Sequence, residues 1–92
     1  MAEATRTVTV GSKVGLHARP ASLFTTAAAA SGHQVTIAKA GGTPVDARSI
    51  LSVMSLGVAG GEELTLAVSG DEAERVLQEL GDMLESDLDA KE

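Results

Sequence analysis

A histidine and an arginine stand two residues apart in the segment Gly15–Ala21, which reads Gly-Leu-His-Ala-Arg-Pro-Ala. Proline suits the first turn of a helix because its missing N–H would have no intrahelical partner there, so the spacing predicts a helix that begins near Ala18. The backbone N–H groups of Ala18 and Arg19 and the helix dipole would favour an anion, and the Arg19 guanidinium can add charge-assisted hydrogen bonds. The same positive end disfavours the imidazolium form and keeps His17 neutral and nucleophilic near pH 7. The segment therefore suits a phosphoryl group carried on His17.

The elements that must position this segment follow the order βαββαβα along residues 1–92. Alternating polar and apolar residues predict strands at 7–10, 33–39, 43–46 and 64–68. Apolar residues at helical spacing predict helices from Ala18 to about residue 31, from 50 to 56, and from Asp71 through Leu88. The Ser49 hydroxyl is expected to cap the second helix, and Asp71 with Glu74 to form a capping box for the third. This order predicts a single α+β domain, a sandwich with an antiparallel or mixed sheet and helices on one face.

Composition excludes several classes of function. The chain has no cysteine, so thiolate metal sites and disulfides are absent, and neither a metal site nor a cofactor is expected. Net charge is −6 and Phe24 is the only aromatic residue, which argues against nucleic acid as a partner. Residues 1–10 contain no apolar signal segment, so we expect a cytoplasmic protein without membrane insertion.

The predicted second helix offers a surface for a protein partner. A helix of two turns cannot bury its whole circumference, so Ile50, Leu51 and Met54 are expected to form an apolar docking patch near His17. Lys13 and Arg48 would place positive charge at its rim and attract an acidic partner. The negative charge is concentrated elsewhere, since residues 71–92 carry −7 and residues 1–70 carry +1.

The segment Gly15–Ala21 resembles the active-site signature of HPr, the histidine-containing phosphocarrier of the phosphoenolpyruvate-dependent sugar phosphotransferase system. The block Arg48–Gly57 and the acidic terminal helix also fall where that family has them. The resemblance implies that His17 is phosphorylated on Nδ1, that Arg19 contacts the phosphate, and that Ser49 matches the regulatory serine of Gram-positive members. A serine that only caps a helix remains the alternative for Ser49. Leu51 stands where many members have methionine, which leaves partner preference open.

The family also implies a fold and a set of partners. The fold is an open-faced β-sandwich in which a four-stranded antiparallel sheet, order 1-4-2-3, lies under three helices. The partners are enzyme I, the enzyme IIA domains of sugar permeases, and either HPr kinase/phosphorylase or a transcription regulator. A monomeric phosphoryl carrier, rather than a stand-alone enzyme, is expected. A nitrogen-branch phosphocarrier and a regulatory HPr-like binding protein stay open as alternatives.

Overall fold

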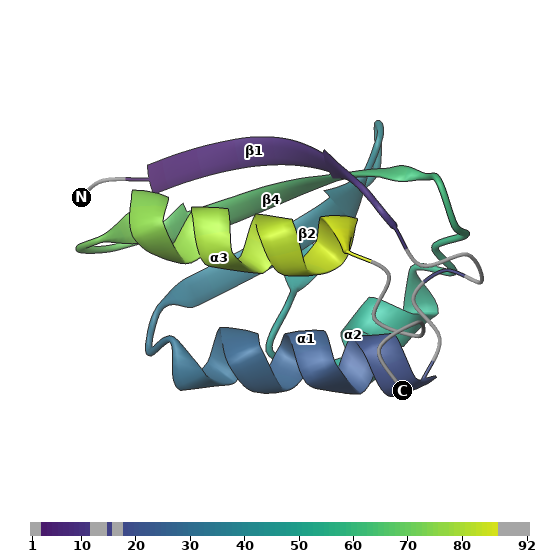
Figure 1. The fold of residues 1–92 in the computed structure, drawn as a ribbon, viewed down its shortest axis with the longest axis horizontal. Helices are drawn as coiled ribbons and strands as arrows, with labels where there is room; N and C mark the ends of the chain where they lie inside the picture. The colour runs from purple at the N-terminus through teal and green to yellow at the C-terminus, as the bar shows by residue number, and fades with distance from the viewer. Residues whose placement is uncertain (1–2, 12–14, 16–17, 87–92) are drawn as a thin grey trace.

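The computed structural model describes residues 3–11, 15 and 18–86 (Figure 1). Its elements follow the predicted order βαββαβα. They are β1 (Glu3–Thr9), α1 (Ala18–Ala30), β2 (Gln34–Lys39), β3 (Val45–Asp46), α2 (Ile50–Ser55), β4 (Glu63–Ser69) and α3 (Ala73–Glu85). In the described part of the chain, no helix is both long and apolar enough to cross a bilayer.

The four strands form one antiparallel sheet in the order β1-β4-β2-β3, which confirms the expected topology. The central strand β4 alternates as its sequence predicts, with Leu64, Leu66 and Val68 fully buried. β3 is shorter than predicted, because only Val45 and Asp46 pair with β2. The helices cover one face of the sheet, and the other face is open (Figure 1).

The core lies between that covered face and the apolar sides of the helices. α1 contributes Ala21, Phe24 and Ala28, each fully buried. Phe24 is the largest of these side chains and, with the two alanines, belongs to the core cluster of buried residues. α3 contributes buried residues at helical spacing, namely Val76, Leu77, Leu80 and Leu84. Ala21 and Ala28 lie near the two ends of α1, so the core reaches along most of this helix.

The capping box predicted for α3 is wrong. The residue at the N-cap is Glu72, which has φ 61°, and its side chain makes no capping hydrogen bond. Its carboxylate instead accepts a hydrogen bond from Arg75 Nη2 at 2.6 Å. The chain must turn back between the end of β4 and α3, and that turn places Glu72 in the left-handed conformation, where its side chain cannot reach the helix N–H groups. Leu88, predicted to continue this helix, lies outside the described residues.

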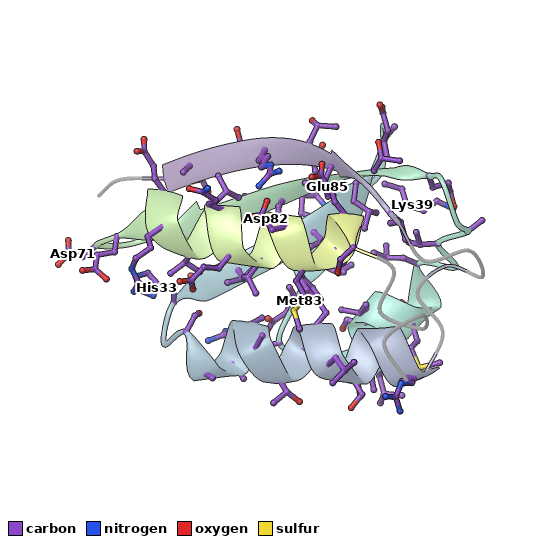
Figure 2. All side chains as sticks on the ribbon, viewed as in Figure 1. His33, Lys39, Asp71, Asp82, Met83 and Glu85 are labelled. Atoms are coloured by element: carbon purple, nitrogen blue, oxygen red, sulfur yellow. The ribbon has the colours of Figure 1, made fainter. Side chains whose placement is uncertain are left out.

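His33 connects two turns at the end of the molecule where α3 begins (Figure 2). Its Nδ1 lies 2.8 Å from the carbonyl oxygen of Ser31, and its Nε2 contacts the carbonyl oxygen of Asp71. Two carbonyl acceptors require a donor on each ring nitrogen, so this geometry favours the imidazolium. The Asp71 carbonyl, followed by that of Ser31, raises the pKa of His33, with Glu72 adding to the effect and Arg75 opposing it.

Candidate functional site

The first turn of α1 has the electrostatic character of an anion site. α1 begins at Ala18, as predicted, and its first turn contains no acidic residue. The first N–H groups of an α-helix have no intrahelical partner, so this end presents the positive end of the dipole and the N–H donors of its first turn, except at Pro20, which has none. Arg19 adds an exposed guanidinium-bearing side chain in the same turn. His17 and Lys13 themselves lie outside the described residues.

Gly15, three residues before α1, packs closely against a loop from a distant part of the chain. It is buried, has φ +83°, and lies so close to the α2–β4 loop (residues 56–62) that an added Cβ would be 2.1 Å from the carbonyl oxygen of Val58. Only glycine tolerates this contact and this conformation together. Just Leu16 and His17 separate Gly15 from the start of α1.

The strand before the motif is attached to the same α2–β4 loop. Val10 N–H donates to the Glu62 carbonyl at 2.9 Å, and Gly61 N–H donates to the Val10 carbonyl at 3.0 Å. Gly11 N–H donates to the carbonyl of Leu84 near the end of α3. The described residues before α1, namely Val10, Gly11 and Gly15, are thus held by contacts with residues far along the chain.

α2 is capped as predicted. The Ser49 Oγ accepts a hydrogen bond from Ser52 N–H at 3.3 Å, and its carbonyl accepts one from Val53 N–H at 3.0 Å. Val53 is fully buried and anchors the helix, which turns its other apolar residues outward. Leu51 is 80% exposed, Met54 42% and Ile50 38%. The three residues proposed from the sequence for docking therefore lie on the surface of α2.

Leu23 is an exposed apolar residue that the sequence pattern did not single out. It is 40% exposed, whereas its neighbour Phe24 is fully buried. Leu23 follows Arg19 by four residues, so both lie on one face of α1, and α1 packs against α2. Among the described residues, the large apolar side chains that are exposed are these four, all on α1 and α2. We call them the α1/α2 apolar residues: Leu23, Ile50, Leu51 and Met54.

Arg48, proposed as a rim cation, is bound to a nearby carboxylate. Its backbone N–H and its Nε donate to Asp46 Oδ1 at 2.9 and 3.1 Å, and its Nη2 donates to Oδ2 at 3.4 Å. The side-chain hydrogen bond from Arg48 lowers the pKa of Asp46. Part of the positive charge expected at this rim is therefore offset by Asp46, which the sequence reasoning overlooked although it lies only two residues away.

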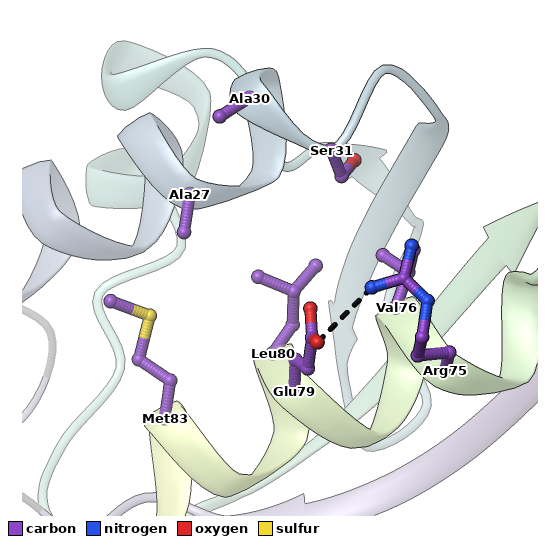
Figure 3. A pocket seen from close by; sticks show the side chains of 8 residues that line it. All are labelled: Ala27, Ala30, Ser31, Arg75, Val76, Glu79, Leu80 and Met83. Carbon is purple, nitrogen blue, oxygen red and sulfur yellow. Dashed lines mark hydrogen bonds and ion pairs between the residues drawn. The ribbon is translucent and has the colours of Figure 1, made fainter.

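A hollow lies elsewhere, between α1 and α3 (Figure 3). It measures about 540 Å³ and is lined mainly by apolar side chains from the second half of α1 and from α3. Its charged groups are paired, since Arg75 Nη1 lies 3.1 Å from Glu79 Oε2. Within the described residues there is also no group of three histidines and carboxylates placed to hold a metal ion. The groups suited to bind an anion, the helix N-terminus and Arg19, lie instead at the start of α1.

Comparison with known proteins gives consistent matches over most of the chain. A family model described as the PTS HPr component phosphorylation site matches residues 4–86. The chain is 51% identical over 86 residues to the phosphocarrier protein HPr of Streptomyces coelicolor, which covers 94% of this chain and 92% of that protein. It is 41% identical over 73 residues to the HPr-like protein Crh of Bacillus subtilis, covering 79% and 85%. The crystal structure of a phosphocarrier protein HPr from Bacillus anthracis matches with a TM-score of 0.85 at 36% identity, covering 91% of this chain and 99% of that one.

Proposed function

Since the chain belongs to the HPr family, we propose that it is a cytoplasmic, monomeric phosphocarrier that accepts a phosphoryl group from phospho-enzyme I on His17. It then passes the group to the enzyme IIA domains of sugar permeases. The observation that carries this proposal is the start of α1, where the first turn has Arg19 and no acidic residue, directly after His17. Such an end stabilises an anion on the preceding residue.

The proposed transfer is a displacement at phosphorus. The unprotonated Nδ1 of His17 attacks the phosphorus atom of phospho-enzyme I, so that the new N–P bond forms as the bond to the donor side chain breaks. The electron pair of the broken bond remains on the donor. In the second half, a nucleophilic side chain of the enzyme IIA attacks the same phosphorus and His17 leaves. Alignment and charge stabilisation are what the carrier must supply, and both are available from Arg19 and the helix N-terminus.

We propose that the partners dock on the α1/α2 apolar residues. Exposed leucine, isoleucine and methionine side chains are costly to leave in water and are typical of the centre of a protein interface. Arg19 lies on the same face of α1 as Leu23, so a partner bound there would meet the phosphate site. Lys13 and Arg48 would favour acidic partners, although Asp46 reduces the contribution of Arg48.

Ser49 is proposed as a regulatory site for HPr kinase/phosphorylase. Its hydroxyl already caps α2 through Ser52, so the cap and the modification would share one oxygen. A phosphate there would add about two negative charges next to Ile50 and Leu51. Those charges would oppose docking of an acidic partner. A regulatory binding protein that contacts a transcription regulator is the alternative, and the presence of His17 favours the carrier.

Phosphohistidine labelling tests the proposal. The full-length chain is incubated with labelled phosphoenolpyruvate, Mg²⁺ and enzyme I, and we expect one acid-labile, base-stable label. His17→Ala should abolish it, while His33→Gln, at the only other histidine, should retain it. Label that persists in His17→Ala would refute the assignment. Labelling by a nitrogen-branch enzyme I homologue, but not by enzyme I, would move the protein to the nitrogen branch.

A further inference from the structure

Lys39, Glu62 and the backbone of Ala59 form a hydrogen-bonded network directly beside the Gly15 contact. Ala59 N–H donates to Glu62 Oε1 at 2.6 Å, and Glu62 N–H donates back to the Ala59 carbonyl at 3.2 Å. Lys39 Nζ lies 3.2 Å from Glu62 Oε2 and 3.5 Å from the carbonyl of Gly57. Figure 2 shows Lys39 at the end of the molecule where this loop runs. The network therefore closes the α2–β4 loop on itself and ties it to β2.

The loop held by this network is the surface against which Gly15 rests. The atoms nearest to an added Cβ at Gly15 are the carbonyl oxygen of Val58, at 2.1 Å, and Cα of Ala59, at 2.9 Å. Ala59 is the same residue whose N–H is bound by Glu62. A change in the conformation of this loop would be transmitted to Gly15 by direct contact, and from there across a single residue to His17.

The hydrogen bond to Ala59 makes Glu62 more than a partner in an exposed ion pair. Surface ion pairs contribute little on average, and both side chains here are about one-third exposed. A carboxylate that accepts a main-chain N–H within one turn is different, because it selects a single loop conformation by a short charge-assisted bond. The bond from Ala59, and then the one from Lys39, lower the pKa of Glu62.

We propose that Glu62, oriented by Lys39, is a positioning residue for the phosphoryl site, which it keeps in place through the α2–β4 loop and Gly15. The inference rests on the proposed function, because it assigns Glu62 a role in transfer to and from His17. Glu62 does not touch the phosphoryl group. It restricts the backbone on which the nucleophile is carried, and alignment is a large part of what phosphoryl transfer needs.

The test compares Glu62→Ala and Glu62→Gln with Glu63→Ala, in which the same charge is removed one residue away at an exposed position of β4. Single-turnover phosphorylation by phospho-enzyme I is measured over a range of carrier concentrations. We expect Glu62→Ala to lower the maximal rate about tenfold, less than a 1 Å misplacement would, and to leave the half-saturating concentration unchanged because the docking residues are intact. Glu62→Gln should recover most of the rate, since its amide oxygen still accepts from Ala59.

The ring resonances of His17 supply a second readout that does not depend on enzyme I. Loosening of the loop should shift the NMR titration of this ring in Glu62→Ala and leave it unchanged in Glu63→Ala. Should Glu62→Ala fail to fold, Lys39→Met, which removes the cation that orients Glu62, takes its place in the comparison with Glu63→Ala, with a lowered maximal rate and a shifted His17 titration expected. A wild-type chain that takes no label would overturn the proposed function and with it this inference. A labelled wild type with normal rates and an unshifted His17 titration in Glu62→Ala would overturn the positioning role alone.

Discussion

Substitution of Gly15 by alanine should slow phosphoryl transfer to His17 and also lower the free energy of unfolding. An added Cβ would lie 2.1 Å from the Val58 carbonyl oxygen, whereas a carbon and an oxygen in contact are normally about 3.3 Å apart. The overlap is therefore about 1.2 Å, and one side must move by roughly that distance. Val58 is buried in the core, so the displacement should fall on Gly15 and the residues after it.

A shift of roughly 1 Å at a nucleophile can lower the rate about 100-fold, which equals about 2.7 kcal/mol of activation free energy. We expect a loss of that order in the rate of His17 phosphorylation, measured by rapid quench with labelled phospho-enzyme I. Alanine at φ +83° also adds about 1 to 2 kcal/mol of backbone strain, which should appear as a lower free energy of unfolding in urea.

Gly32→Ala separates these two effects. Gly32 has φ +73°, and an added Cβ there meets nothing within 4 Å, so the variant carries the strain without the overlap. It lies after the last turn of α1, at the end of that helix opposite His17. We expect a loss of stability of about 1 to 2 kcal/mol from the strain alone, smaller than in Gly15→Ala, and a rate of transfer within about twofold of wild type. Equal slowing of both variants, or a normal rate in Gly15→Ala, would refute the argument from the Val58 contact.

Three further outcomes follow from the described contacts. Leu51→Ala should change the free energy of unfolding by less than about 0.5 kcal/mol, because the side chain is 80% exposed, and should raise the half-saturating concentration for enzyme I. A half-saturating concentration equal to that of wild type would show that Leu51 is not part of the docking surface. Ser49→Asp should slow phosphorylation of His17 with little change in Tm, and a large fall in Tm would show that the serine is chiefly a cap. The folded-state pKa of His33 is raised, so its contribution to stability is complete below the unfolded pKa of about 6.5 and is lost as pH rises through the folded value. The urea midpoints of wild type and His33→Gln should therefore converge above that range. A difference that stays constant with pH would argue against the imidazolium.

The sequence alone determined those features that depend on neighbouring residues. Pro20 favours the first turn of a helix, so α1 begins at Ala18 as predicted. Ser49 precedes a short apolar helix and caps it. Alternation along Leu64, Leu66 and Val68 identified the buried face of β4, because side chains in a strand point to opposite faces in turn. The prediction of an anion site at residues 15–21 likewise rested only on residues that are neighbours in the sequence.

The tertiary structure decided how distant residues meet. The periodicity of α1 did not distinguish Leu23 from Phe24, because which of two adjacent apolar residues faces the core depends on how the helix is rotated against the sheet. The left-handed conformation of Glu72 follows from the path between β4 and α3, which overrode the local capping signal. The approach of Gly15 to Val58 and the pairing of Lys39 with Glu62 join segments far apart in the chain. No pattern of neighbours encodes them, because such contacts are set by sheet order and loop path together.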